Sequence, residues 1–246
     1  MEIMTDARFE AYGTPHLVVL AVFVAGLVLM PLWGRAHRGT EREQPVRRAY
    51  VVVVGVVAVG MQAFQLTPGD YDVDTSWPFQ LSDLSYVAAV VALWTRSPRA
   101  TAFTYYVGLT LTVQALLTPS LAEGFPHPRF FGFFLLHGAV VWSAVYLVWG
   151  LGIRPTWPLF RWTVLVTTAW AVAASVFNLL ADTNYGYLNA KPSSGSGLDY
   201  LGPWPVYVFA TIAILVTGWA VALTWPWTRA QRRRQRRSRS RSSTPA

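Results

Sequence analysis

Long apolar segments alternate along this chain with short polar ones. A helix needs about 20 mostly apolar residues to cross the hydrocarbon core of a membrane. Seven segments approach this length, with ends loose by a few residues: 15–33, 48–66, 78–95, 101–118, 129–151, 159–181 and 204–226. The pattern predicts an all-α polytopic membrane protein, a bundle of about seven transmembrane helices that forms one domain over residues 1–227.

The composition favours the same class of protein. Of the 246 residues, 53% are hydrophobic and 13% are charged, whereas soluble domains carry about a quarter charged residues. Tryptophan or tyrosine stands at many segment ends, as in the aromatic belts of membrane proteins. The chain has no cysteine, which excludes disulfides, thiolate nucleophiles and cysteine-ligated metals.

Positive charge lies almost entirely in alternate loops. Seventeen of the 20 lysines and arginines fall in or beside loop 34–47, the third loop, the fifth loop and the C-terminal tail. Only Arg8, Arg129 and Lys191 lie on the other side. The positive-inside rule therefore predicts a multi-pass protein of the cell membrane with its N-terminus outside and its C-terminus in the cytoplasm.

The last segment of the chain, residues 228–246, is rich in arginine and serine. This composition predicts a disordered cytoplasmic tail that anchors the topology and attracts anionic membrane lipids. No aromatic residue follows Trp227 to stack on bases, so no nucleic-acid partner is expected.

Polar side chains within the apolar segments are costly and mark candidate functional sites. With this topology they all lie toward the outer side: His16, Gln62, Gln65, Gln80, Ser82, Asp83, Ser85, Gln114, Thr118, His137, Asn178 and Asp182. Six helices are therefore predicted to converge on one outward-opening pocket. Outer-loop residues would cover it, among them Asp70, Asp72, Asp74, His127, Asn184, Tyr185, Lys191 and Asp199.

Simpler roles stay open for several of these side chains. Glutamine, serine and threonine in membrane spans often just tie helices together. The acidic triplet at 70, 72 and 74 lacks the glycine and closing glutamate of a calcium loop, which favours a solvated loop and no metal site. His127 can cap the next helix. Asp83 and His137 are each the only aspartate, glutamate, histidine, lysine or arginine in the interior of their segment, so we expect them to pair.

Several cofactor-based functions do not fit the residues present. The only lysine, Lys191, lies in a loop, so no retinal Schiff base is expected. His137 is the one histidine deep in a segment, whereas a membrane haem needs paired axial ligands. A proton pump needs ionisable groups across the bilayer, and the inner halves of the segments show none. No cofactor is therefore expected.

Acyl transfer or hydrolysis fits the available side chains better. This chemistry needs a nucleophile, a base and an orienting acid, and Ser82, His137 and Asp83 supply these types. Ser82 and Asp83 are adjacent, so on a helix they point about 100° apart. Both can face His137 only if the helix bends, and Trp77-Pro78 lies where a bend could form.

Specific motifs extend over nearly all of residues 9–226. They include Gln114–Pro119, Phe125-Pro126-His127, His137-Gly138, Asn178, Asn184-Tyr185, Lys191-Pro192, Leu198–Pro205, Tyr12, Pro15-His16-Leu17 and Asp83. In these motifs the chain resembles the YwaF-like bacterial membrane proteins, which are related to eukaryotic transmembrane protein 164. The resemblance implies the same fold. It also implies a phospholipid or acyl-chain ligand, because the eukaryotic relative is described as a phospholipid acyltransferase that uses a cysteine in the third-span region.

The chain departs from the family pattern in that region. Bacterial members typically have histidine and cysteine where this chain has Gln80 and Ser82. Two functions therefore stand side by side: lipid acyl transfer or hydrolysis, and non-catalytic binding or transport of a lipid or small molecule in the same pocket. The distances among Ser82, Asp83 and His137 would discriminate between them.

Overall fold

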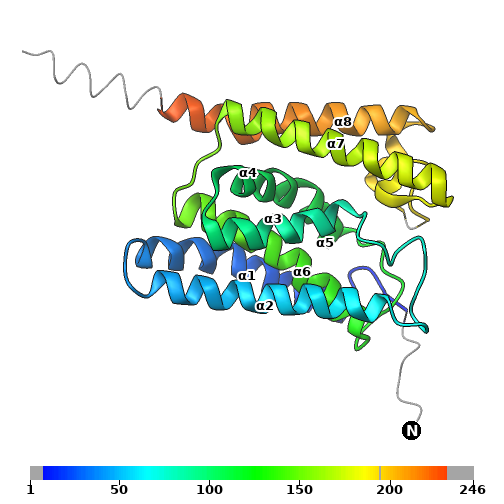
Figure 1. Ribbon diagram of the computed structural model, residues 1–246, viewed down its shortest axis with the longest axis horizontal. Helices are drawn as coiled ribbons and strands as arrows, with labels where there is room; N and C mark the ends of the chain where they lie inside the picture. The colour runs from blue at the N-terminus through cyan, green and yellow to red at the C-terminus, as the bar shows by residue number, and fades with distance from the viewer. Residues whose placement is uncertain (1–7, 194, 232–246) are drawn as a thin grey trace, which may run out of the picture.

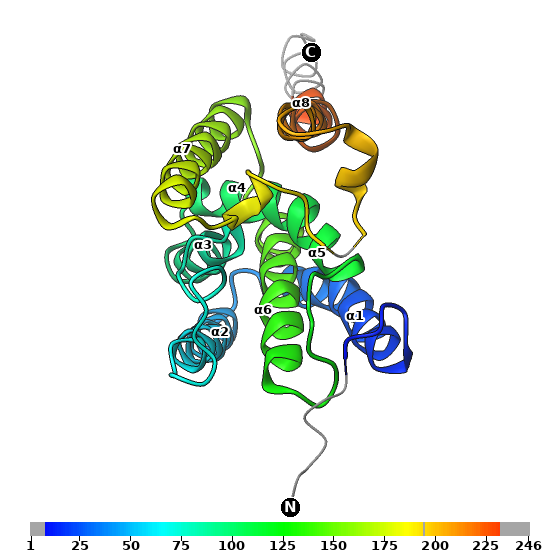
Figure 2. The same cartoon turned by 90° about the vertical axis from the view of Figure 1, so that its right-hand side faces the viewer.

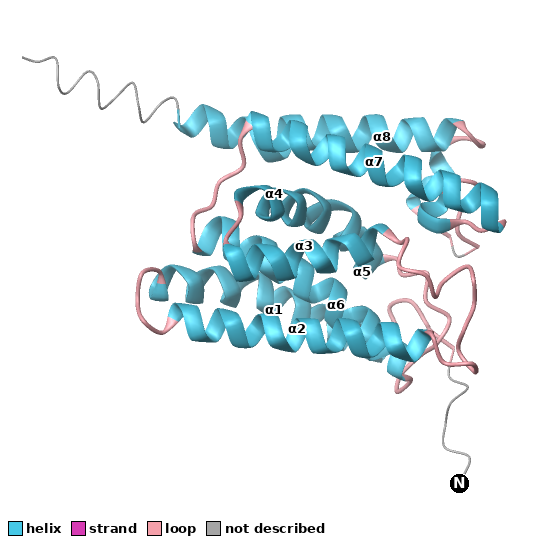
Figure 3. Ribbon diagram, in the orientation of Figure 1, coloured by secondary structure: helices cyan, strands magenta, loops and turns pink. Residues whose placement is uncertain are grey.

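The computed structural model describes residues 8–193 and 195–231 and is helical throughout, with no strand in these residues (Figure 3). Its helices are α1 (Thr14–His37), α2 (Glu43–Gln65), α3 (Leu81–Thr95), α4 (Pro98–Val107), α5 (Val113–Leu117), α6 (Pro128–Val145), α7 (Trp157–Ala181) and α8 (Val206–Gly218). Three π-helical stretches, η1 (Gly108–Thr112), η2 (Tyr146–Gly150) and η5 (Trp219–Thr224), extend α4, α6 and α8. Two short 3-10 turns, η3 (Tyr185–Tyr187) and η4 (Gly197–Leu201), lie between α7 and α8. The predicted all-α class is confirmed.

Six helices are long and apolar enough to cross a membrane: Thr14–His37, Glu43–Gln65, Pro98–Leu117, Pro128–Gly150, Trp157–Ala181 and Val206–Gln231. The segment expected at 78–95 is shorter, because α3 has only 15 residues. It starts at Leu81, after Trp77-Pro78 and a turn, and the residue before a proline disfavours the helical conformation. A seventh crossing through α3 therefore stays a prediction.

Helix α6 forms the centre of the bundle, with α1, α2, α3 and the α4–α5 rod around it (Figures 1 and 2). In its most apolar stretch 78% of residues are buried inside the protein, compared with 11% for α1, α7 and the α8 rod. Helices α7 and α8 lie on one side of the bundle, over α3 and α4 (Figure 1). The chain therefore exposes most of the α1, α7 and α8 surfaces, which are apolar and suited to lipid.

Two glycines explain how closely α1 approaches α6 and η2. A Cβ added to Gly26 would lie 2.1 Å from the indole Nε1 of Trp142, and that nitrogen donates a hydrogen bond to the Phe23 carbonyl over 3.0 Å. A Cβ at Gly34 would lie 2.8 Å from the Cα of Gly150. Small residues at such crossings let helix backbones touch in a membrane.

The bundle has two different ends. Loops 66–80, 118–127 and 182–205 gather at one end, which we call the loop end (Figure 1). Turns 38–42, 96–97 and 151–156 gather with the last turns of the α8 rod at the other, which we call the basic end. The basic loops thus share one end, and the orientation in the membrane stays a prediction. The last helix runs to Gln231, and residues 232–246 of the predicted tail lie outside the described residues.

Candidate functional site

Asn178, at the loop end of α7, organises the turn that follows its helix. Its Nδ2 donates to the Tyr185 carbonyl over 3.0 Å, and its Oδ1 accepts from the Tyr185 amide at 2.7 Å and from the Thr183 hydroxyl at 2.9 Å. The side chain is buried. Because its polar atoms are occupied by the protein's own chain, Asn178 holds loop structure and offers little to a ligand.

Tyr185 joins the two large loops at this end. Its hydroxyl donates to the Val73 carbonyl over 2.7 Å and accepts from the Trp77 amide at 2.9 Å. Burial, followed by the nearby Asp83, Asp74 and Asp72 carboxylates, raises the pKa of Tyr185 to about 12. The phenol therefore stays neutral at physiological pH and keeps its donor role.

Asp83, the predicted orienting acid, serves the start of its own helix. Its Oδ2 accepts a hydrogen bond from the Gln80 amide over 2.9 Å, as the third residue of a capping box does. Gln80 in turn accepts at Oε1 from the Gly186 amide at 3.3 Å. Among the described residues no hydrogen bond joins Asp83 to His137, because the carboxylate is turned toward the first turn of α3.

His137 is buried in the middle of α6 and stacks on Phe133, with ring centroids 4.1 Å apart. Its Nδ1 lies 2.8 Å from the Phe133 carbonyl oxygen and 3.0 Å from the Tyr86 hydroxyl. A carbonyl oxygen can only accept, so Nδ1 carries the proton and Nε2 is the basic nitrogen. Nε2 has no hydrogen-bond partner in the part of the chain that the structure describes.

Tyr86 connects Ser82 to this histidine. The two residues lie one turn apart on α3, so the Ser82 side chain lies near the Tyr86 hydroxyl. The same hydroxyl contacts His137 Nδ1 from the neighbouring helix. The sequence analysis did not single out Tyr86, although its spacing of four residues from Ser82 places both on one helix face.

His16 makes a separate contact between α1 and α5. Its Nδ1 accepts from the Tyr12 amide at 2.9 Å, and its Nε2 donates to the Leu116 carbonyl at 2.9 Å. The ring is buried against Phe9 and Phe134. With both nitrogens occupied, His16 fixes the segment before α1 and does not face the Ser82–Tyr86–His137 group.

The remaining predicted pocket residues form local contacts. Gln114 is exposed and donates from Nε2 to the Thr118 hydroxyl over 2.6 Å. His127 caps α6, where its Nδ1 accepts from the Arg129 amide at 3.2 Å. Asn184 accepts from the Asn189 and Ala190 amides, Lys191 donates to the Asp199 carbonyl, and Asp199 caps η4.

Apart from the residues with only local contacts, the candidate site residues fall into three groups. One is the Asn178–Tyr185–Gln80–Asp83 network, the second is Ser82–Tyr86–His137, and the third is His16 with Leu116. The first two adjoin on α3, where Ser82 and Asp83 are neighbours. Within the described residues no three histidine, aspartate or glutamate side chains are placed to hold a metal ion.

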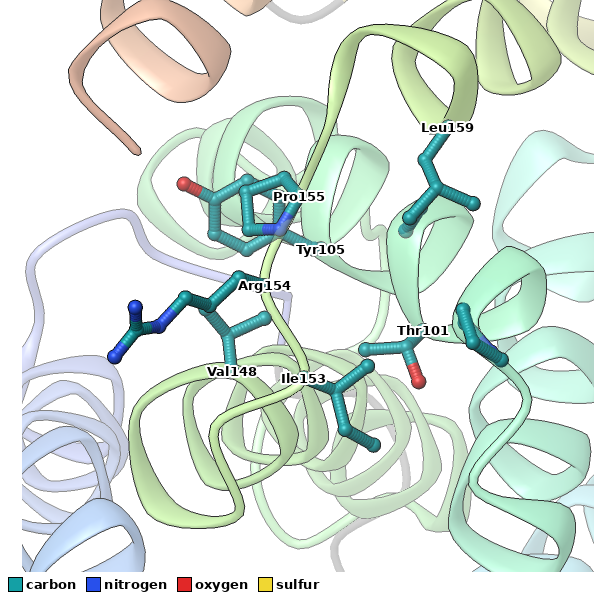
Figure 4. A pocket seen from close by; sticks show the side chains of 9 residues that line it. Thr101, Tyr105, Val148, Ile153, Arg154, Pro155 and Leu159 are labelled. Atoms are coloured by element: carbon teal, nitrogen blue, oxygen red, sulfur yellow. The ribbon is translucent and has the colours of Figure 1, made fainter. Parts of the chain in front are cut away.

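An apolar groove lies beside the second group, between α2 and α6. It is open at the bundle surface, has a volume of about 500 Å³, and is lined by Val57, Gly60, Met61, Pro126, Pro128, Phe131, Gly132 and Leu135. Val57 and Met61 also pack on the buried cluster of Val54, Leu136 and Ala139, against which Tyr86 packs from the other helix. A second, narrow depression at the basic end, between α4 and loop 151–156, is too small to hold a water molecule (Figure 4).

A buried charged cluster at the basic end corrects the expectation that the inner halves of the segments lack ionisable groups. Glu43 is 2% exposed; its Oε1 accepts from Arg47 Nε at 2.8 Å and from the Tyr146 hydroxyl at 2.7 Å, and its Oε2 pairs with Arg96. Arg47 also donates to the Leu93 and Trp94 carbonyls at the end of α3. The sequence analysis assigned Glu43 to a loop, but α2 already begins there.

Comparisons with known proteins agree with the helical membrane architecture. The model of the TMEM164 family matches residues 11–223, from the residues before α1 to the last turns of the α8 rod. Searches of curated proteins and of solved structures gave no match to the chain.

Proposed function

The chain belongs to the TMEM164 family of membrane proteins, and from its geometry we propose that it transfers or hydrolyses acyl groups of membrane lipids at the Ser82–Tyr86–His137 group. One observation carries the proposal: the Tyr86 hydroxyl lies 3.0 Å from His137 Nδ1, and Ser82 lies one turn before Tyr86 on the same face of α3. A hydroxyl nucleophile and an imidazole are thereby held in one small region between α3 and α6.

Each member of the group has a distinct role in this reaction. The Ser82 oxygen attacks the ester carbonyl carbon, the bond to the lysolipid oxygen breaks, and an acyl-serine forms. Ser82 lies on the Nδ1 side of the ring, beyond Tyr86, so in this reaction the serine side chain turns toward Nε2, which accepts the serine proton and returns it to the leaving lysolipid oxygen. The acyl group then passes to water or to the hydroxyl of a second lipid. Tyr86 positions the Ser82 hydroxyl beside the ring.

The Phe133 carbonyl takes the place that the sequence analysis gave to Asp83. It accepts the Nδ1 proton at 2.8 Å, which fixes the imidazole tautomer and leaves Nε2 as the base. An acceptor on the far nitrogen also stabilises the imidazolium that forms when Nε2 is protonated. The peptide carbonyl is neutral, so this stabilisation is weaker than that from a carboxylate.

The groove between α2 and α6 supports an acyl substrate. Its lining is apolar, and apolar clefts with few polar groups suit long hydrocarbon chains. Val57 and Met61 link the groove to the packing layer that contains Tyr86. We propose that an acyl chain lies in this groove with its ester turned toward α3, the helix that carries Ser82.

The test is turnover by purified protein in nanodiscs of phospholipid, followed by mass spectrometry of released or transferred acyl groups. Ser82→Ala and His137→Ala should each abolish turnover, and the double variant should be no worse than either alone. Ser85→Ala is the matched control, because that buried hydroxyl bonds to the Leu81 carbonyl of its own helix. Absence of turnover, or full activity of Ser82→Ala, would refute the catalytic proposal.

A second function, non-catalytic binding or transport of a lipid or small molecule, is favoured by one feature of the same group. Tyr86 stands between Ser82 and His137, and no hydrogen bond joins these two directly within the described residues. Protein that retains a defined lipid through purification but turns over no ester would support this function. Met61→Trp, which fills the groove, should then reduce the retained lipid.

A further inference from the structure

Arginines at the basic end are stacked on tryptophans. Four guanidinium carbons lie over indole rings: Arg48 over Trp94 at 5.0 Å, Arg99 over Trp162 at 4.9 Å, Arg154 over Trp227 at 5.8 Å, and Arg229 over Trp225 at 5.2 Å. The pairs come from α2 and α3, from α4 and α7, from loop 151–156, and from the end of the α8 rod. We call these eight residues the arginine–tryptophan belt.

The belt arginines have no carboxylate partner among the described residues. The four ion pairs found there use Arg47, Arg96 and Arg129 instead. The acidic residues at the basic end are Glu41 and Glu43, and Glu43 is buried and fully engaged by its own cluster. The belt guanidinium groups are therefore left with uncompensated positive charge.

Stacking leaves the donors of these arginines available. The guanidinium uses its flat face against the indole ring, while its N–H groups point outward from the edge. That fork of donors matches two oxygens of a phosphate. A stacked arginine also has less side-chain entropy to lose on binding, because the ring already holds its position.

The tryptophans place these donors at the depth of lipid headgroups. Trp94 is 52% exposed and Trp225 is 49% exposed, at the ends of helices that expose apolar surface, and tryptophan prefers the membrane–water interface. The loop end differs, since it carries Asp70, Asp72, Asp74, Glu123, Asp182 and Asp199. The charge of the two ends therefore favours anionic lipid at the basic end alone.

We propose that the arginine–tryptophan belt is a docking surface for the phosphate headgroups of anionic phospholipids in the leaflet that the basic end faces. Each stacked arginine offers a preset fork to a phosphodiester, and the net positive charge selects lipids whose headgroup is anionic over zwitterionic ones. This proposal does not depend on the acyl-transfer function.

The experiment measures lipid retention by the full-length protein. Protein is exchanged into nanodiscs of equal phosphatidylglycerol and phosphatidylcholine, and the lipids retained after mild detergent extraction are counted by native mass spectrometry. The triple variant R48K/R99K/R154K keeps every positive charge and the topology signal but loses the planar fork and much of the stacking. Arg42→Lys is the control, because Arg42 is exposed and outside the belt.

We expect the native protein to retain more phosphatidylglycerol than phosphatidylcholine. In the triple lysine variant the ratio of the two retained lipids should be about tenfold lower. The arginine-rich tail is present in both proteins, so the difference between them reports the belt. Equal retention of the two lipids by the native protein would overturn the proposal. Unchanged enrichment in the triple variant, with Arg42→Lys also unchanged, would overturn it as well.

Discussion

The loop end and the basic end solve the problem of polar groups in a membrane protein differently. At the loop end, Asn178, Tyr185 and Gln80 are satisfied mainly by backbone groups of adjacent loops. At the basic end, Glu43 and Arg47 bury opposite charges against each other. Because a buried charge costs far more than a neutral group when its partner is lost, the basic end should tolerate substitution least.

Residues at both ends of the bundle form hydrogen bonds with the same short helix, α3. Gln80 and Asp83 set the start of α3 at the loop end, while Arg47 holds the carbonyls of Leu93 and Trp94 at its other end. Helix α3 carries Ser82 and Tyr86. The charged cluster therefore helps to fix the height at which these side chains meet His137, even though it lies at the opposite end of the bundle.

The largest expected effect is all-or-none and concerns which end faces the cytoplasm. The chain has no cysteine, so single cysteines can be placed without background. A cysteine at Thr40, at the basic end, should be inaccessible to a membrane-impermeant maleimide in intact cells, whereas one at Ser193 should label. Labelling of the cysteine at position 40 from outside would show that the basic end faces outward and that the predicted orientation is wrong.

The next largest effect is expected in the buried charged cluster. Glu43→Ala leaves Arg47 buried without its partner, which should destabilise the protein by about 3–5 kcal/mol. Thermal unfolding in detergent measures this, with Glu41→Ala as the exposed control. The double variant Glu43→Ala/Arg47→Ala should lose less than the sum of the single losses, because the two groups are coupled. An additive loss would contradict the pairing.

A smaller loss of stability is expected at the loop end. Asn178→Ala leaves the buried Tyr185 amide and carbonyl without partners, at a cost of about 1–3 kcal/mol. Gln114→Ala is the control, because its side chain is exposed and bonds only to Thr118. If Asn178→Ala unfolds at the same temperature as the native protein, the network around Tyr185 does not stabilise the loop end.

The smallest change in stability separates the roles of Asp83 and Tyr86. Asp83→Asn keeps an oxygen for the Gln80 amide, so stability should change by less than about 1 kcal/mol and lipid turnover should persist. Tyr86→Phe removes only the hydroxyl and should lower turnover, because Ser82 loses its link to His137. A large loss of turnover in Asp83→Asn at unchanged stability would restore the carboxylate to the role of orienting acid.

The sequence was enough to predict a helical membrane protein, but it did not predict which side chains contact one another. Segment length and hydropathy identified the long helices, including the polar Pro98–Leu117, because crossing the hydrocarbon core sets a minimum length. The start of α2 was placed too late, since the sequence analysis grouped Glu43 and Arg47 with the arginines of loop 34–47. Their spacing of four residues, which places opposite charges on one helix face, was the signal that could have found the pair.

For the candidate site, the sequence by itself determined which side chains lie at the loop end, because their depth follows from their distance along a helix to its end. Only the tertiary structure decided which of them meet across helices. The contact of Asp83 with the Gln80 amide and the nearness of Ser82 to Tyr86 are local to α3, whereas the packing of α3 on α6 brings Tyr86 to His137. Depth along a helix is a local property of the chain, whereas facing another helix depends on rotation and crossing, which the packing of the whole bundle sets.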